Sequence, residues 1–191
     1  MRQIPNLLGV FRVLTTPIMV YWILQGDGWS LLYAAVLLLA MAISDIIDGN
    51  LARRLGVVSP LGIFLDTISD KIFVAGALIP MVELAMLPSW YALVIIVREF
   101  AVSGLRSYAA SQGVVIPARS WGKQKLTFTV MAIIWILVFY ALPQIVGSPW
   151  WFVWLSTWWL IPAGLALVWT VGSGIEYFWN ARALLARAVS L

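Results

Sequence analysis

Long apolar stretches dominate this chain, and they restrict its fold more than any other feature. Hydrophobic residues make up 63% of the 191 residues and charged residues only 10%, and the mean hydropathy is +0.97. Since a helix needs about 20 apolar residues to cross a bilayer, the chain has room for roughly six spans and little else. The sequence therefore predicts an all-α polytopic membrane protein, a single transmembrane domain over residues 1–191.

Clusters of glycine and proline divide the apolar stretches. They predict a bundle of six transmembrane helices at residues 5–25, 29–55, 60–86, 89–111, 121–142 and 150–181. Ser59 followed by Pro60 is a typical start for the third of these helices. The first segment carries Arg12 and lacks an obvious cleavage site of small residues, so we expect no cleavable signal peptide.

Basic residues lie mainly on one side of the predicted bundle. Those near the two termini and in the 2–3 and 4–5 connections are Arg2, Arg12, Arg53, Arg54, Arg106, Arg119, Lys123, Lys125, Arg182 and Arg187. The other three connections contain no Lys or Arg. The positive-inside rule then predicts that both termini are cytoplasmic, in a cell (inner) membrane. At the opposite helix ends lie Trp29, Trp90, Trp150 and Trp151, where an aromatic belt is expected.

Two absences limit the chemistry. The chain has no cysteine and no histidine, so acid–base and metal chemistry must use carboxylates, lysines and hydroxyls. The isoelectric point near 9.7 does not indicate nucleic acid, because the positive charge lies mostly at membrane edges, where it sets topology or meets anionic lipid head groups.

Four of the eight acidic residues, Asp45, Asp48, Asp66 and Asp70, lie within one short stretch. Carboxylates in a membrane are costly unless they are paired, hydrated or bound to metal. Their spacing places each pair on one helical face, near the cytoplasmic ends of neighbouring antiparallel helices. Four such charges would repel one another unless cations lay between them, so the first hypothesis is a divalent-metal site.

Two other interpretations of the aspartates remain. They would pair with Arg53, Arg54 and Lys71 or face water, or they would line the path of a divalent-cation transporter. The small residues Gly49, Ala52 and Gly62 lie on the same faces and leave room for a ligand.

A second polar set follows in the fourth and fifth helices. Its members are Arg98, Glu99, Ser103, Gly104, Arg106, Arg119, Lys123 and Lys125. Arginines within a span are rare, and cations that converge beside a metal site suggest phosphate recognition. The alternative is a structural Arg98–Glu99 pair together with ordinary loop charge. Taken together, metals, phosphate-binding cations and a site at the inner interface indicate chemistry on a phospholipid head group.

The run Asp45-x2-Asp48-Gly49-x2-Ala52-Arg53-x8-Gly62-x3-Asp66-x3-Asp70 resembles the signature of the CDP-alcohol phosphotransferases at every fixed position. Three further segments are similar to the branch of that family that uses glycerol phosphate: Ile4 to Leu8 with Phe11 and Arg12, Arg98-Glu99 with Ser103 to Arg106, and Gly122 to Lys125. Two positions depart from the family pattern, Ser69 in place of alanine and Leu126 in place of threonine.

This resemblance implies transfer of a phosphatidyl group from CDP-diacylglycerol to sn-glycerol 3-phosphate, with release of CMP. It implies one or two Mg²⁺ or Mn²⁺ ions, with Asp45, Asp48, Asp66 and Asp70 as ligands and Asp70 also as the general base. CDP-diacylglycerol would contact Asp48, Gly49, Ala52, Arg53 and Gly62, and glycerol phosphate would contact Arg98, Arg106, Lys123 and Lys125. Family members that use inositol phosphate, serine or phosphatidylglycerol remain as alternatives, and the resemblance implies a homodimer.

Overall fold

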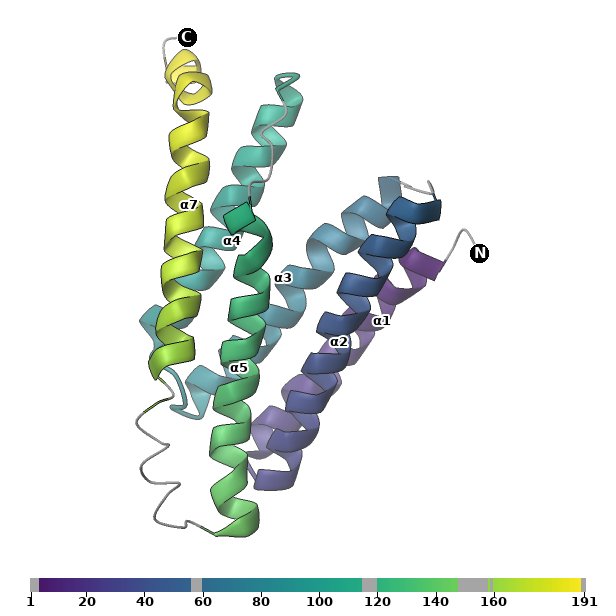
Figure 1. The fold of residues 1–191 in the computed structure, drawn as a ribbon, viewed down its shortest axis with the longest axis vertical. Helices are drawn as coiled ribbons and strands as arrows, with labels where there is room; N and C mark the ends of the chain where they lie inside the picture. The colour runs from purple at the N-terminus through teal and green to yellow at the C-terminus, as the bar shows by residue number, and fades with distance from the viewer. Residues whose placement is uncertain (1–3, 56–59, 115–119, 148–157, 159, 190–191) are drawn as a thin grey trace.

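The computed structural model of the protein describes residues 4–55, 60–114, 120–147, 158 and 160–189. Side chains are described for residues 9–47, 67–114, 124–147, 158 and 161–182. Within these ranges the chain forms long helices and no strand (Figure 1). The helices are α1 (Ile4–Gln25), α2 (Gly28–Leu55), α3 (Pro60–Glu83), α4 (Ser89–Ser111), α5 (Ser120–Val146) and α7 (Leu160–Val189). The all-α prediction is confirmed for the described residues.

The predicted start and end of α4 are confirmed, and those of α1 and α2 lie within one residue of the prediction. The third helix ends at Glu83 and not at residue 86. The N–H of Met86 donates to the carbonyl of Met81, and that of Ala85 donates to Val82. These two bonds form a Schellman end, with Ala85 in the left-handed conformation at a φ of 54°. Because alanine replaces the usual glycine there, the sequence carried no signal for this end.

The last two helices differ more from the prediction. Helix α5 continues through Pro143, which was predicted to end it, and stops at Val146. A proline at this position removes one helical hydrogen bond, a loss that membrane helices commonly tolerate. Helix α7 begins at Leu160 and continues to Val189, eight residues beyond the predicted residue 181. The stretch from Arg182 to Val189 contains strong helix formers and neither glycine nor proline, which explains the longer helix.

The helices pack in a closed order in which each contacts the next: α3, α1, α2, α5, α7, α4 and again α3. Helices α2 and α3 run antiparallel, as predicted, but they contact each other only slightly because α1 packs against both (Figure 1). The start of α1, the end of α2, the start of α3 and the end of α7 lie at the same end of the bundle. We call this the acidic end, since the aspartate run connects α2 and α3 there.

Two glycines allow close contact between helices. A Cβ added at Gly76 of α3 would lie 2.5 Å from Cγ2 of Thr16 on α1. At the opposite end of the bundle, a Cβ at Gly28 of α2 would lie 2.8 Å from the carbonyl oxygen of Ala141 on α5. These contacts fix α1 against α3 and α2 against α5, so they help to set the positions of both acidic helices.

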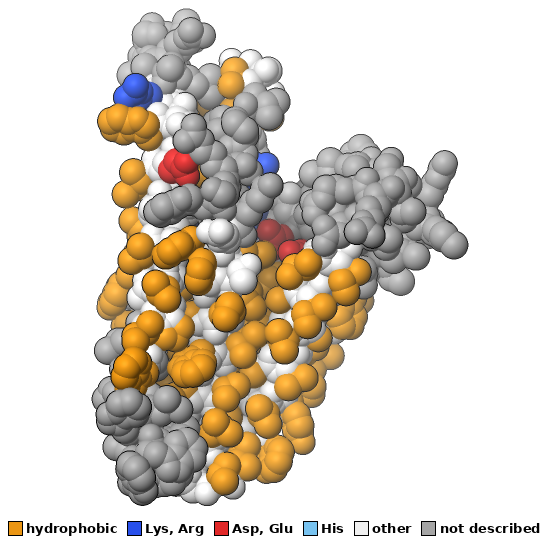
Figure 2. Space-filling model, in the orientation of Figure 1, with side chains coloured by type: hydrophobic (Ala, Val, Ile, Leu, Met, Phe, Trp, Pro, Cys, Tyr) orange, Lys and Arg blue, Asp and Glu red, His pale blue; other side chains and the backbone are white. Residues whose placement is uncertain are grey.

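Apolar side chains fill the interior and also cover the outside. The core includes Met19, Leu38, Phe73, Leu78 and Ile133, all at most 1% exposed. Large hydrophobic side chains lie exposed on every helix whose side chains are described, and they cover most of the face in Figure 2. Among the described residues, two helical stretches are long and apolar enough to cross a bilayer, Gly28–Ile47 and Gln124–Val146. The apolar helices and the apolar exterior indicate a membrane protein.

Candidate functional site

The acidic end contains an ion pair between α1 and α2. A guanidinium nitrogen (Nη1) of Arg12 contacts Oδ1 of Asp45, and the Arg12 side chain is only 1% exposed. The hydroxyl of Thr16 donates to the backbone carbonyl of Arg12 at 2.7 Å. Asp45 is therefore paired with an arginine from a different helix, which the interpretation with Arg53, Arg54 and Lys71 did not include.

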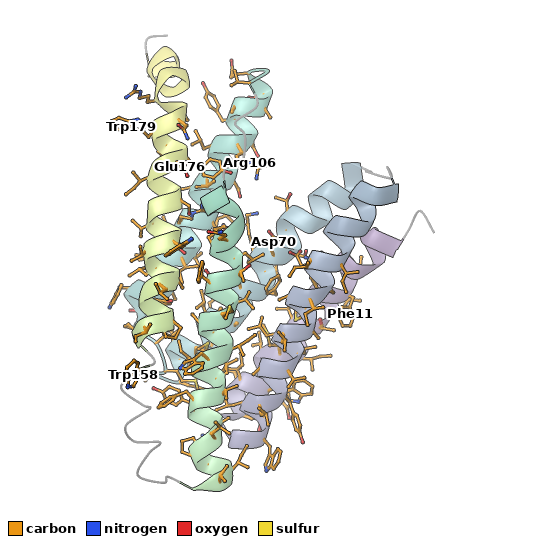
Figure 3. The ribbon with its side chains drawn as sticks, viewed as in Figure 1. Phe11, Asp70, Arg106, Trp158, Glu176 and Trp179 are labelled. Carbon is orange, nitrogen blue, oxygen red and sulfur yellow. The ribbon has the colours of Figure 1, made fainter. Side chains whose placement is uncertain are left out.

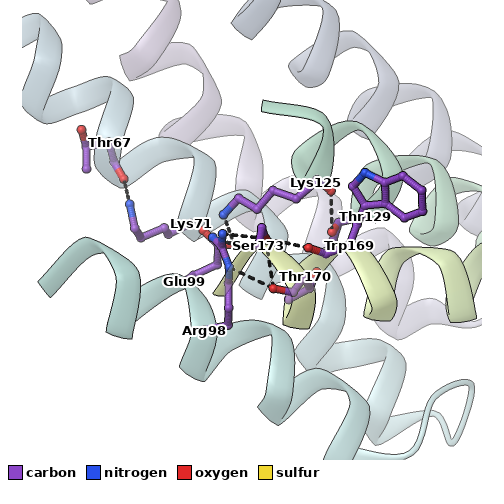
Figure 4. Close-up of polar contacts among 9 residues, drawn as sticks. All are labelled: Thr67, Lys71, Arg98, Glu99, Lys125, Thr129, Trp169, Thr170 and Ser173. Atoms are coloured by element: carbon purple, nitrogen blue, oxygen red, sulfur yellow. Dashed lines mark hydrogen bonds and ion pairs between the residues drawn. The ribbon is translucent and has the colours of Figure 1, made fainter. Parts of the chain in front are cut away.

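The structure describes the side chains of two of the four predicted metal ligands. Asp45 on α2 and Asp70 on α3 are both partly buried. The backbone positions of Asp48 and Asp66 lie in the same two helices, but their side chains lie outside the described residues. The same holds for the predicted donor-binding residues Gly49, Ala52, Arg53 and Gly62. Lys71, next to Asp70, donates to the backbone carbonyl of Thr67 (Figure 4).

A second polar group connects α4, α5 and α7, and Glu99 is at its centre. Oε1 of Glu99 accepts from Nη1 of Arg98 at 3.3 Å and also contacts Nζ of Lys125 on α5 (Figure 4). Arg98 makes two further contacts to α7: Nε donates to the carbonyl of Thr170 at 3.2 Å, and Nη2 donates to the hydroxyl of Ser173 at 2.8 Å. The predicted Arg98–Glu99 pair is thus part of a larger network between three helices.

Arg98 is closely packed against α7. Its side chain is 8% exposed, and its Cζ lies 5.9 Å from the centre of the Tyr177 ring. A Cβ added at Gly174 would lie 3.2 Å from Cγ of Arg98, so the glycine makes room for the arginine stem. The other predicted arginine of α4, Arg106, is exposed about two turns further along (Figure 3). The two arginines therefore have different environments, and the side chain of Lys123 lies outside the described residues.

The two polar groups lie close together. Lys125 lies near enough to three charged side chains for their charges to act on it. Two of them, Arg98 and Glu99, are on α4, and the third, Asp70, is on α3. Figure 3 shows Asp70 on the side of α3 that is turned toward α5. In the space-filling view, acidic side chains are visible at this end of the bundle (Figure 2). Asp70 of α3 and Lys125 of α5 therefore lie near one another at this end.

The residues present fit a hard divalent cation. The chain offers only oxygen donors at the acidic end, because it has no histidine and no cysteine, and carboxylate oxygens are the ligands that Mg²⁺ and Mn²⁺ prefer. Within the described side chains, no group of three acidic residues is close enough to hold an ion. Asp45 and Asp70 are two of the four carboxylates that the aspartate run supplies.

Sequence reasoning did not find the inter-helix partners of the site. Arg12 served only in the arguments on topology, signal peptide and family resemblance, although an arginine inside an apolar helix is a signal for a buried ion pair. Thr170 and Ser173 were not singled out. Their spacing of three residues places them on one face of α7, but nothing in the sequence indicates that this face meets Arg98.

Comparisons with known proteins agree with the aspartate run. The pattern of the CDP-alcohol phosphatidyltransferase family matches residues 2–170. The chain is 34% identical to the CDP-diacylglycerol–glycerol-3-phosphate 3-phosphatidyltransferase of Bacillus subtilis (strain 168), over 95% of this chain and 97% of that protein.

Two further proteins that bear the same name are similar to the chain. For the protein of Escherichia coli (strain K12), the identity is 34% over 95% of this chain and 96% of that protein. For the protein of Pseudomonas fluorescens, the identity is 36% over 76% of this chain and 83% of that protein. The family pattern covers most of the chain and includes the whole aspartate run. The chain therefore belongs to the CDP-alcohol phosphatidyltransferase family.

Proposed function

We propose that this protein transfers the phosphatidyl group of CDP-diacylglycerol to sn-glycerol 3-phosphate, which yields phosphatidylglycerophosphate and CMP in anionic phospholipid biosynthesis. The names of the similar proteins support this reaction. The observation that carries the proposal is that Asp70 of α3 lies near enough to Lys125 of α5 for their charges to interact, while Lys125 is paired with Glu99. This supports a site in which carboxylates for a metal-bound pyrophosphate would lie close to cations for an acceptor phosphate.

In the proposed reaction, a hydroxyl oxygen of glycerol 3-phosphate attacks the phosphorus that carries the diacylglycerol. The bond from that phosphorus to the CMP oxygen breaks, and CMP leaves. Asp70 takes the proton of the attacking hydroxyl, since no histidine is present to act as the base. Asp45, Asp48, Asp66 and Asp70 would hold one or two Mg²⁺ or Mn²⁺ ions, which would supply positive charge to neutralise the pyrophosphate and stabilise the leaving group.

The donor would bind along the aspartate run. In this proposal CDP-diacylglycerol contacts Asp48, Gly49, Ala52, Arg53 and Gly62. The glycines and the alanine leave space for the cytidine diphosphate, and Arg53 adds a positive charge beside the phosphates. The family resemblance of these positions supports the assignment.

The acceptor phosphate would bind to the cations of α4 and α5. We assign Arg98, Arg106, Lys123 and Lys125 to this role. Glycerol 3-phosphate is a small dianion with little apolar surface, so its affinity must come from charged hydrogen bonds. The Nη1 atom of Arg98 and the Nζ atom of Lys125 both contact one oxygen of Glu99. An anionic oxygen is therefore already bound between these two cations, as a phosphate oxygen would be.

The same proposal includes the topology. A single CDP-alcohol phosphotransferase domain over residues 1–191 would cross the inner membrane six times, with both termini and the active site on the cytoplasmic side. The start of α1 and the end of α7 lie at the same end of the bundle in Figure 1, which supports this arrangement. So do Trp29 and Trp90, more than half exposed in the first turns of α2 and α4 at the other end. A homodimer is expected from the family.

The test is release of CMP from CDP-diacylglycerol by the purified protein in detergent, with a panel of acceptors. We expect CMP only when an acceptor is added, and most rapidly with glycerol 3-phosphate. Faster release with inositol phosphate, serine or phosphatidylglycerol would move the protein to another branch of the family. No release with any acceptor, together with Mg²⁺ or Mn²⁺ flux into vesicles containing the protein, would favour a divalent-cation transporter.

A further inference from the structure

Helix α1 is the element that connects the two acidic helices. It packs extensively against α2 and α3, which contact each other only slightly. On the α3 side, Thr16 fits against Gly76, where a Cβ would lie 2.5 Å from Cγ2 of the threonine. On the α2 side, one helical turn earlier, Arg12 forms its ion pair with Asp45. Adjacent turns of α1 therefore hold α2 and α3.

The Arg12 side chain is unusual for a structural ion pair. It is 1% exposed and is among the largest fully buried side chains described in the protein. A buried arginine requires a fixed partner, because desolvation of its charge is costly. That partner, Asp45, is a carboxylate that the proposed reaction uses as a metal ligand. Side chains that form hydrogen bonds to a metal-binding residue commonly set the orientation of that residue and its affinity for the metal.

We propose that Arg12 is a positioning residue of the metal site: its guanidinium fixes the rotamer of Asp45 so that the remaining carboxylate lone pairs are directed toward the ion. This inference rests on the proposed function, because it takes Asp45 as a metal ligand. In this role Arg12 acts through Asp45 and requires no contact of its own with substrate or metal. Planar guanidinium binds a carboxylate in a defined geometry, whereas lysine supplies only a point charge.

A substitution of Arg12 would change the metal affinity in opposite directions, depending on whether Arg12 acts by orienting Asp45 or by its charge alone. Loss of one positive charge beside the site would by itself attract a cation more strongly. Loss of orientation would weaken metal binding, commonly by about 10- to 100-fold for the outer partners of metal ligands. The direction of the change in metal affinity therefore distinguishes a positioning residue from a purely electrostatic neighbour.

The experiment measures Mn²⁺ binding to the detergent-solubilised full-length protein by electron paramagnetic resonance, without either substrate. In Arg12→Met, which keeps an apolar stem, we expect Mn²⁺ affinity to fall by about 10- to 100-fold. Arg12→Lys should give an intermediate affinity. The matched control is Arg182→Met. It removes an exposed arginine whose Cζ lies 4.7 Å from the centre of the Trp179 ring, and it should leave Mn²⁺ affinity unchanged.

A double-variant comparison tests whether Arg12 acts through Asp45. Asp45→Asn should weaken Mn²⁺ binding, and addition of Arg12→Met should weaken it no further. If Arg12→Met does not fold, as judged by its thermal unfolding, Arg12→Lys alone still tests the proposal through its intermediate affinity. Unchanged or tighter Mn²⁺ binding in the folded Arg12 variants, or additive losses in the double variant, would overturn it. So would absence of Mn²⁺ binding in the unaltered protein.

The outcome is separable from that of the proposed function. Unaltered protein that makes phosphatidylglycerophosphate while the Arg12 variants bind Mn²⁺ normally would overturn the positioning role only. Protein that makes no such lipid, yet loses Mn²⁺ affinity with Arg12→Met, would overturn the reaction and support the positioning role.

Discussion

Lys125 on α5 and Glu99 on α4 form an ion pair at the end of the bundle where the aspartates lie. The two side chains are 14% and 19% exposed, and the same glutamate oxygen accepts from Arg98. The pair thus connects α4 and α5 close to the proposed reaction centre, and Arg98 extends the connection to α7.

Glu99→Gln should destabilise the protein, because a neutral amide replaces the charged acceptor of two cations. We expect a loss of about 1–3 kcal/mol of unfolding free energy, typical of a charged group left without its partner. Thermal unfolding in detergent measures this effect. Glu83→Gln removes an exposed carboxylate at the end of α3 and is the control. Equal stability of both variants would contradict a structural role for the Glu99 network.

Arg98→Ala and Arg106→Ala should both raise the KM for glycerol 3-phosphate and leave the KM for CDP-diacylglycerol nearly unchanged. Loss of one charge-assisted contact costs about 1.5–3 kcal/mol, or roughly 10- to 150-fold in affinity. Lysine at either position should recover part of the affinity, since it keeps the charge without the planar fork. Steady-state kinetics with each substrate varied in turn provides the measurement.

The two arginine variants should differ in stability. Arg98→Ala also removes the contacts to Thr170 and Ser173, so its unfolding midpoint should fall, whereas exposed Arg106 should be replaceable without such a change. If the affinity for CDP-diacylglycerol falls and that for glycerol 3-phosphate does not, the acceptor assignment is wrong.

Gly76→Ala should destabilise the contact between α1 and α3. The added methyl group would overlap Cγ2 of Thr16, and overpacking of this kind costs about 1–3 kcal/mol. Thr16→Ser removes Cγ2 but keeps the hydroxyl, so the double variant Gly76→Ala/Thr16→Ser should regain stability. Gly164→Ala, whose added Cβ meets no atom within 4 Å, is the control. Failure of Thr16→Ser to rescue Gly76→Ala would show that the close helix contact is not the cause.

Asp70→Asn should abolish turnover and largely spare CDP-diacylglycerol binding. The amide keeps the shape of the side chain but cannot take the proton of the acceptor hydroxyl. Turnover and donor binding are measured on the same detergent-solubilised preparation. Asp27→Asn, which changes an exposed carboxylate but keeps a good N-cap for α2, is the matched control. Substantial turnover by Asp70→Asn would remove Asp70 from the role of base.

The helices could be predicted where glycine and proline mark their ends. Ser89 after Pro88 and the Gly26–Gly28 turn are such places. The predicted helix ends were wrong at two places. Helix α3 ends where Ala85, which is not glycine, takes the left-handed conformation. Helix α5 continues through Pro143, which was predicted to end it. Local sequence reports the conformation that a residue prefers, while packing decides which conformation it adopts.

The site could be predicted in part. Helical spacing placed Asp45 and Asp70 on helix faces at one end of the bundle, because a period of 3.6 residues is a local property. The partner of Asp45 is 33 residues away in the sequence, and Arg98 meets Thr170 from a distance of 72 residues. Such pairings depend on which helices pack together, and the hydrophobic pattern of a membrane helix does not specify its neighbours.

The most direct measurement for the central claim is identification of the lipid product by mass spectrometry. Purified protein is incubated with CDP-diacylglycerol, glycerol 3-phosphate and Mg²⁺ or Mn²⁺, and a parallel sample contains excess EDTA. The account predicts phosphatidylglycerophosphate with metal, none with EDTA, and recovery when the metal is restored. Full activity in excess EDTA, or no phosphatidylglycerophosphate with either metal, would contradict it.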